Sequence, residues 1–117
     1  MKRFLLVDDN SALRSALRLM LETRLNMLSV LEAGAHAHMI ELSMVHQPDY
    51  LILDWELSGF NRHNCLDALR DLLPELKIIV ISAQPEAASA ARADAFVSKI
   101  DPPSEVLNAI RRLNGKN

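Results

Sequence analysis

The sequence predicts an α/β fold in which a doubly wound, five-stranded parallel sheet is covered by helices on both faces. Short β-rich runs alternate with longer stretches whose apolar residues recur every three or four positions, which is the pattern of successive βαβ units. Four of the five β-rich runs have apolar centres without polar alternation, as expected of strands buried on both sides. The chain has 117 residues, the size of one domain, and we expect that domain to span residues 1–117.

Each element follows from a local pattern. The expected strands lie near residues 3–7, 27–32, 49–53, 77–82 and 95–98. The second run alternates in part, which favours a place at the sheet edge. The first helix carries apolar residues at helical spacing from Leu13 to Leu21, with Arg14, Arg18 and Glu22 on its opposite face. The second and third helices run from about residue 35 to 46 and from about 64 to 73, and each stops before a proline.

The last two helices are predicted from different sequence features. The segment from Glu86 to Ala93 is short and rich in Ala and Ser, so it predicts a shortened fourth helix. Asp101 followed by Pro102 is the pattern of a helix cap with a proline in the first turn, and it predicts where the last helix begins. The apolar stripe of that helix ends before Gly115.

Composition limits the classes of partner and compartment. The 13 basic and 15 acidic residues give a net charge of −2, which offers no electrostatic footprint for nucleic acid or an anionic membrane. The longest apolar runs have four residues, far too few for a membrane span or a secretory signal. The single cysteine, Cys65, excludes an intrachain disulfide, so we expect a cytoplasmic protein.

Polar side chains stand at the carboxyl ends of four predicted strands. Asp8 and Asp9 follow the first, Asp54 the third, Ser82 ends the fourth, and Lys99 follows the fifth. Because open parallel sheets bind ligands at that end of their strands, we expect these groups to converge. Three clustered carboxylates repel one another and should recruit a hard divalent cation, with Mg²⁺ the best match.

These motifs resemble those of the receiver domains of two-component response regulators. Val7-Asp8-Asp9-Asn10 is similar to the acidic pair of that family, and Leu51-Ile52-Leu53-Asp54 to its phosphoacceptor strand. Ile81-Ser82-Ala83 is similar to its hydroxyl position, and Phe96-Val97-Ser98-Lys99 to its switch aromatic and lysine. The resemblance extends over the whole chain and implies the flavodoxin-like strand order 2-1-3-4-5.

The resemblance also implies roles in phosphoryl chemistry. Asp54 would be the carboxylate nucleophile that becomes an aspartyl phosphate, with Lys99 as a point-charge partner of the phosphoryl group. Mg²⁺ would be held by Asp9, the Asp54 carboxylate and the backbone carbonyl of Glu56, while Asp8 would act through a bound water. The acidic pair has an alternative use, because one of its members could cap the helix that begins near Asn10.

Ser82 and Phe96 are the expected switch residues. Ser82 would donate a hydrogen bond to a phosphoryl oxygen and draw the following loop inward, and Phe96 would fill the vacated space. Phe96 is alternatively a plain core aromatic. Glu56 and Gln84, two positions past Asp54 and Ser82, should flank the approach of the hydrolytic water. Glu56 could either repel the phosphoryl group or pair with Lys99.

The resemblance implies a phosphorylation switch. The chain would take a phosphoryl group from a sensor histidine kinase or a histidine phosphotransfer protein, and would control an output, with a C-terminal effector domain as a candidate. Its chemistry would be limited to phosphorylating and dephosphorylating itself, so it would not be an enzyme acting on other substrates. The alternative is a degenerate interaction module that works without phosphorylation. A phosphatase built on Asp54-Trp55-Glu56 is disfavoured, since the chain has no spare residues for a cap over a substrate.

The sequence departs from the family pattern in four places, one of which is Arg92, where the family's usual Gly-Ala pair begins. Ser82 and Lys99 lie 17 positions apart, about one helical turn fewer than the family usually has. Ser58-Gly59 stands where Pro-Gly is usual, and Ile100-Asp101-Pro102 replaces an immediate proline after Lys99. The shortened fourth helix puts dimerisation or output through that face in doubt, although the five site residues are all present.

Overall fold

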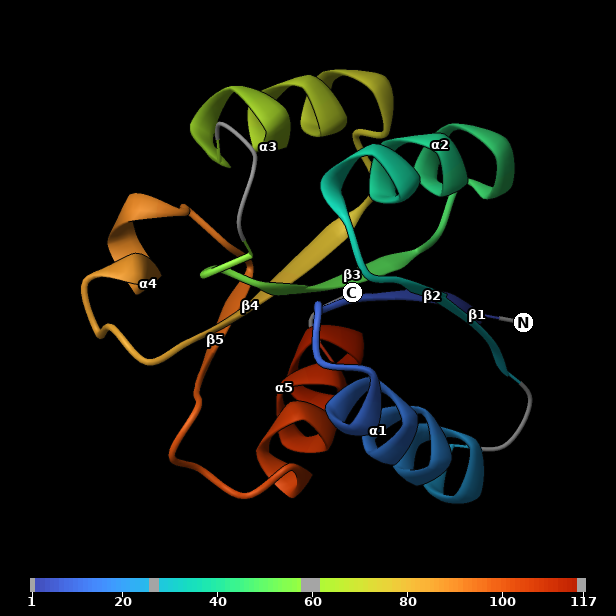
Figure 1. Cartoon of the computed structure of the whole chain (residues 1–117), viewed down its shortest axis with the longest axis vertical. Helices are drawn as coiled ribbons and strands as arrows, with labels where there is room; N and C mark the ends of the chain where they lie inside the picture. Colours follow the sequence, from blue (N-terminus) through green and yellow to red (C-terminus); the bar gives the residue numbers. More distant parts are fainter. Residues whose placement is uncertain (1, 26–27, 58–61, 116–117) are drawn as a thin grey trace.

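The chain forms five strands and five helices in strict alternation over the described residues (Figure 1). The structure is a computed structural model that describes residues 2–25, 28–57 and 62–115. The strands are β1 (Lys2–Val7), β2 (Leu28–Ala33), β3 (Tyr50–Asp54), β4 (Lys77–Ser82) and β5 (Ala95–Ser98). The helices are α1 (Ser11–Arg24), α2 (His36–His46), α3 (Arg62–Leu72), α4 (Ala87–Ala90) and α5 (Ser104–Asn114). Ser58 and Gly59, where the sequence departs from the family pattern, lie outside the described residues.

All neighbouring strands run parallel, in the order β2-β1-β3-β4-β5. This confirms the predicted doubly wound sheet and places β2 at an edge, as its partial alternation indicates. In the register of the central strands, Val7 pairs with Leu53 and Asp54 pairs with Ile81. The carboxyl ends of the strands therefore meet at one end of the sheet.

Two hydrophobic cores lie on opposite faces of the sheet. Alternate strand residues, such as Leu5 and Leu51, pack on the core shared with α2, α3 and α4, while their neighbours Phe4 and Ile52 pack on the core shared with α1 and α5. Figure 1 shows the same layers, with α1 and α5 on one face and α2 and α3 on the other. Burial on both faces explains why the strand sequences lack polar alternation.

The fourth helix is as short as its sequence predicts. α4 has four residues, and its inward side chain Ala87 is 1% exposed. The chain then turns through Arg92, whose φ of 48° lies in the left-handed region that disfavours side-chain-bearing residues.

The predicted start of the last helix is wrong by two residues. Asp101 does not cap α5: its N–H donates to the carbonyl of Ser98 at 3.0 Å and so closes a turn after β5. The helix cap is Pro103, and α5 begins at Ser104. Because two prolines follow Asp101, the sequence pattern allows the helix to begin at more than one position. The turn after β5 uses Asp101, so the helix begins later. None of the helices in the described ranges is long and apolar enough to cross a lipid bilayer.

Candidate functional site

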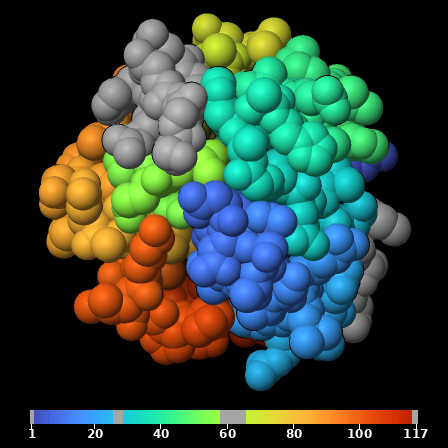
Figure 2. All heavy atoms as spheres, in the orientation of Figure 1, coloured from blue at the N-terminus to red at the C-terminus, as the bar shows by residue number. Residues whose placement is uncertain are grey.

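Three carboxylates meet at the carboxyl end of the sheet. Asp8 and Asp9 follow β1, Asp54 is the last residue of β3, and one oxygen from each lies within 4.8 Å of the others. Asp8 and Asp54 are buried, at 5% and 4% exposure, whereas Asp9 is exposed. In Figure 2, green atoms after β3 lie between blue atoms after β1 and orange atoms after β4 and β5. The predicted convergence of the acidic residues is thus present in the fold.

Burial is the largest influence on the pKa of Asp8. It raises the pKa of the Asp8 carboxyl above its ordinary value, against the lowering effect of a hydrogen bond that the Asn10 N–H donates to Asp8 Oδ1 at 2.8 Å. The charge of Asp54 raises the same pKa further. A cation bound among these carboxylates would relieve the cost of their negative charges.

The cap of α1 is Asn10, so the acidic pair is not used to cap the helix. The Asn10 side-chain oxygen accepts a hydrogen bond from the Leu13 N–H at 3.1 Å, which satisfies a free donor in the first turn. The alternative use of Asp8 or Asp9 as helix cap is therefore wrong. Both carboxylates stay at the strand end.

Arg14 supports the acidic pair in a way that the sequence pattern did not reveal. Its Nη1 donates to the backbone carbonyl of Asp8, and its Nε donates to Glu32 Oε1 at 3.2 Å. Arg18 donates to the other Glu32 oxygen at 2.9 Å. A Cβ added at Gly34 would lie 3.0 Å from Arg14 Nη1, so the glycine leaves room for this guanidinium. The signal available in the sequence was a glutamate in an edge strand together with two arginines four residues apart.

Lys99 joins the site from the end of β5. Its ammonium lies 2.9 Å from Asp54 Oδ1 and 3.3 Å from Glu56 Oε1. Burial alone would lower the pKa of Lys99, but the hydrogen bond to Asp54 and the negative charges of both carboxylates outweigh it and raise that pKa. Lys99 therefore remains positively charged beside the buried Asp54 carboxylate.

Glu56 faces into the site. Ser82 Oγ donates to Glu56 Oε2 at 2.6 Å, and the Ala83 N–H donates to Glu56 Oε1 at 2.8 Å. Burial alone would raise the pKa of the Glu56 carboxyl, but these hydrogen bonds and the ammonium of Lys99 hold it below its ordinary value. Of the two effects that the sequence leaves open for Glu56, the pairing with Lys99 is present in the structure, and repulsion of a phosphoryl group stays a prediction.

The two remaining predicted residues are Phe96 and Gln84. Phe96 in β5 is partly buried and packs against the core on the α2 and α3 side. Gln84 is exposed, and its backbone N–H donates to Ser82 Oγ at 3.0 Å. The Asp54 carboxylate also accepts the Glu56 N–H at 3.0 Å. Asp8, Asp9, Asp54, Ser82 and Lys99 thus come together with Glu56 and the backbone of Gln84, while Phe96 packs in the core on the α2 and α3 side.

The donor set fits a hard divalent cation. Oxygen ligands from few protein groups, with room for water, are what Mg²⁺ prefers. Asp8, Asp9 and Asp54 offer three carboxylate oxygens in one small volume, and one of the three side chains is open to solvent. These three residues could hold such an ion.

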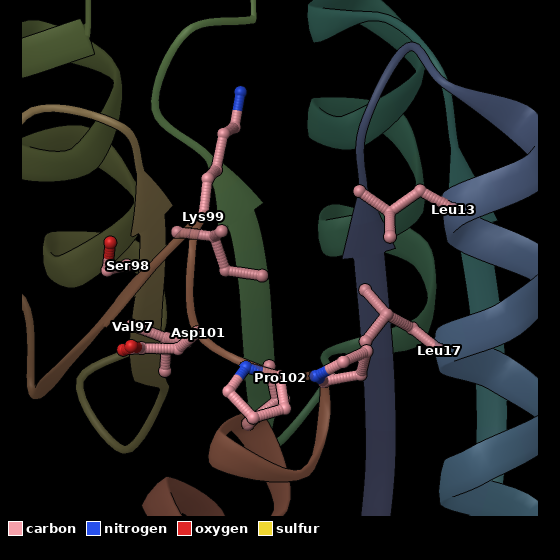
Figure 3. A pocket seen from close by; sticks show the side chains of 10 residues that line it. Leu13, Leu17, Val97, Ser98, Lys99, Asp101 and Pro102 are labelled. Carbon is pink, nitrogen blue, oxygen red and sulfur yellow. The ribbon is translucent and has the colours of Figure 1, made fainter.

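A small apolar hollow lies on the α1 and α5 side of Lys99. Its volume is about 160 Å³, and Leu13, Leu17, Val97 and Pro102 line it. Figure 3 shows Leu13 and Leu17 projecting from α1 toward this hollow. Pockets for small organic ligands usually enclose about 300 Å³ or more. The hollow is therefore too small to serve as a substrate pocket.

Several curated proteins match this chain along most of its length. A curated relative, the transcriptional activator protein ExaE of Pseudomonas putida, is 34% identical over 114 residues, covering 93% of this chain and 53% of the relative. The chain spans about half the length of the curated relatives it matches.

Solved structures agree in fold. The receiver domain of a putative NarL response regulator from Mycobacterium tuberculosis has a TM-score of 0.84 at 24% identity, over 99% of this chain and 98% of that one. A Burkholderia pseudomallei response regulator with a phosphorylated aspartic acid and a calcium ion has a TM-score of 0.80 at 23% identity, over 99% and 73% of the two chains.

The family model of the response regulator receiver domain matches residues 4–111. This range includes Asp8, Asp9 and Asp54, and also Ser82 and Lys99. The chain therefore belongs to the family of response regulator receiver domains.

Proposed function

We propose that this receiver domain, spanning residues 1–117, accepts a phosphoryl group on Asp54 in a Mg²⁺-dependent reaction. The observation that carries the proposal is the buried Asp54 carboxylate, which has the Lys99 ammonium at 2.9 Å and two further carboxylates within 4.8 Å. A buried nucleophilic oxygen, a fixed positive charge and a cation-binding cluster are the parts that phosphoryl transfer requires.

The proposed reaction is a displacement at phosphorus. An oxygen of Asp54 attacks the phosphorus of the donor, a P–O bond to Asp54 forms, and the bond to the leaving group breaks. With acetyl phosphate the leaving group is acetate, and with a phosphohistidine it is the imidazole of the donor. Bound Mg²⁺ would offset the negative charge on the transferring oxygens.

Residues of this chain orient the nucleophile. The Glu56 N–H, at 3.0 Å, and the Lys99 ammonium both contact Asp54 Oδ1 and so fix the plane of the carboxylate. Lys99 is placed to pair with the phosphoryl group once it is attached. Asp9, Asp8 and the backbone carbonyl of Glu56 are the proposed remaining contributors to cation binding.

The proposed donor is a sensor histidine kinase or a histidine phosphotransfer protein in the cytoplasm. The Burkholderia response regulator with a phosphorylated aspartic acid supports the chemistry. The transcriptional activator among the relatives supports an output in gene control through an effector domain. Ser82 and Phe96 are the proposed switch residues between the phosphorylated site and that output.

A second candidate function is a phosphorylation-independent interaction module. The four-residue α4 favours it. A helix of one turn presents little surface whose position could change on phosphorylation and be recognised by a partner. The two functions differ in a single measurable property, the ability of Asp54 to take a phosphoryl group.

Intact-mass spectrometry with acetyl phosphate and Mg²⁺ separates the two functions. The wild-type chain should gain the mass of one phosphoryl group, and chelation of Mg²⁺ should abolish the gain. Asp54→Asn should gain none, while Asp71→Asn, an exposed change of the same kind on α3, should label as the wild type does. Labelling of Asp54→Asn at the wild-type rate would overturn the assignment of the nucleophile, and absence of labelling in all proteins would favour the interaction module.

A further inference from the structure

The Glu56 carboxylate contacts three hydrogen-bond donors that come from two other strand ends. One oxygen accepts from Ser82 Oγ at 2.6 Å, and the other accepts from the Ala83 N–H at 2.8 Å and lies 3.3 Å from Lys99 Nζ. A hydroxyl, an amide and an ammonium thus converge on a single anionic group. Such a set of donors is typical of a site for an oxyanion.

Chain geometry explains how Glu56 reaches these donors. β3 ends at Asp54, and the next residues form a turn in which the Leu57 N–H donates to the Asp54 carbonyl at 3.1 Å. The Glu56 side chain leaves this turn beside Lys99, with 27% of its surface exposed. It can therefore exchange between the donors and solvent without disturbing β3.

The contacted side chains are the same ones that the proposed function assigns to a phosphoryl group on Asp54. The Lys99 ammonium bridges Asp54 and Glu56, so the Glu56 carboxylate lies next to the nucleophile. Ser82 is fully buried, and its hydroxyl has one proton to donate, which Glu56 already accepts. A phosphoryl oxygen and the Glu56 carboxylate cannot both accept that proton.

We infer that Glu56 is an intramolecular ligand of the phosphoryl-oxygen site, and that it must leave this site when Asp54 is phosphorylated. The inference rests on the proposed function. In the unphosphorylated protein, Glu56 keeps Ser82 and Ala83 engaged and competes with any incoming anion. On phosphorylation, Ser82, Ala83 and Lys99 exchange the Glu56 carboxylate for phosphoryl oxygens, and Glu56 turns toward solvent.

A simpler effect, repulsion between the Glu56 charge and the phosphoryl group, also predicts slower phosphorylation. The Glu56→Asp variant distinguishes the two explanations. This variant keeps the negative charge but draws the carboxylate back by one methylene, so that it no longer reaches all three donors. Occupation of the site predicts that Glu56→Asp binds an anion more tightly than the wild type, whereas repulsion predicts no gain.

The test uses beryllofluoride, a non-covalent mimic of the phosphoryl group, at fixed Mg²⁺, with binding followed through backbone amide NMR. We expect Glu56→Ala and Glu56→Gln to bind it about fivefold more tightly than the wild type, and Glu56→Asp to fall between them and the wild type. Glu75→Gln is the matched control, because Glu75 is exposed before the start of β4, at the opposite end of the sheet. Its affinity should equal that of the wild type.

A comparison without anion tests the contact itself. Removal of the carboxylate in Glu56→Ala should shift the Ala83 amide resonance and speed its hydrogen exchange, while Glu75→Gln should leave both unchanged. Equal beryllofluoride affinity in all proteins, or wild-type affinity in Glu56→Asp alone among the Glu56 variants, would overturn the inference. An unchanged Ala83 amide in Glu56→Ala would do the same. Failure of every protein to bind beryllofluoride would instead count against the proposed function, and the Ala83 comparison would still decide the contact.

Discussion

Buried polar side chains of the described chain gather at the site. Four such residues are buried, and Asp8, Asp54 and Ser82 lie at the carboxyl end of the sheet, while Ser43 lies in α2. Removing a carboxylate from water costs free energy unless charges or hydrogen bonds compensate. At the residue scale, the site is therefore maintained at a cost in stability.

Asp8→Asn should stabilise the protein in metal-free buffer. The folded-state pKa of Asp8 lies above its ordinary value of 3.8, so the contribution of Asp8 to stability falls as pH rises from that value through the folded pKa. Ionised Asp8 thus opposes folding at pH 7. Asparagine keeps an oxygen for the Asn10 N–H, and we expect a gain of about 1 kcal/mol in unfolding free energy. Urea unfolding with a chelator measures it; a loss of stability larger than that of the exposed control Asp9→Asn would contradict the explanation.

Arg14→Ala should weaken Mg²⁺ binding by about tenfold, since it removes the guanidinium that holds the Asp8 carbonyl and with it the loop of the acidic pair. Arg18→Ala is the control: it also removes a contact with Glu32 but none with Asp8. Fluorescence of Trp55, the single tryptophan and the neighbour of Asp54, is the measurement for a Mg²⁺ titration. Equal Mg²⁺ affinity in the two variants would show that Arg14 supports only the helix surface.

At the scale of elements, the connection from β4 to β5 depends on α3. Arg92 forms an ion pair with Asp67 in α3 at 2.8 Å, and Arg70 Nη2 donates to the carbonyls of Ala91 and Arg92 at 3.3 and 2.6 Å. The hydrogen bonds from Arg70 anchor the end of the four-residue α4, which has little helical structure of its own. In the same turn, the backbone of Arg92 adopts a left-handed conformation.

Two substitutions at Arg92 separate backbone strain from the ion pair. Arg92→Ala loses the ion pair and keeps the strained φ of 48°, whereas Arg92→Gly loses the pair and relieves the strain. The ion pair is exposed and contributes little, so we expect the glycine variant to be more stable than the alanine variant by about 1 kcal/mol. Urea unfolding of both proteins checks the order. An alanine variant at least as stable as the glycine variant would show that the turn is not strained.

Strand patterns allowed the elements to be predicted, whereas some of their contacts could not be. Apolar runs such as Ile78–Ile81 predict strands buried on both sides, and the rule for parallel sheets then brings Asp54 and Lys99 to one end. Side chains beyond a strand end are different, because a turn decides where they point. Nothing in the sequence chooses between Glu56 facing solvent and Glu56 facing Lys99. Helical periodicity likewise places Arg14 on the polar face of α1 without revealing which carbonyl it reaches.

At the scale of the whole molecule, the unfolding free energy depends on pH through carboxylates whose pKa values shift in opposite directions. Hydrogen bonds from Arg18 lower the pKa of Glu32 against the effect of burial, and Arg14 lowers it further. The pKa of Glu56 is lowered as well. Both residues contribute stability above their ordinary pKa of 4.5, and that contribution is lost as pH falls through their folded-state pKa values. The pKa of Asp8 is raised instead, so the contribution of Asp8 to stability is lost as pH rises.

Glu32→Gln isolates one part of this pH dependence. At pH 7 it should lower the unfolding free energy by about 0.5–1 kcal/mol, because partly exposed ion pairs are screened by solvent. Below the folded-state pKa of Glu32 the carboxyl is protonated in both states, so the stabilities of the variant and the wild type should converge. Urea unfolding from pH 7 down to the acid transition measures the gap. A gap that persists at low pH would show that the effect of the substitution is not electrostatic.

Chemical mapping of the phosphorylated residue distinguishes Asp54 from the two other carboxylates of the site. Borohydride reduces an acyl phosphate to a primary alcohol, so an aspartyl phosphate at position 54 becomes homoserine and marks its peptide for mass spectrometry. After treatment with acetyl phosphate and Mg²⁺ and reduction with borohydride, we predict homoserine at Asp54, and none at Asp8 or Asp9. Homoserine at either of those residues with Asp54 unchanged, or no reducible acyl phosphate at all, would contradict the account.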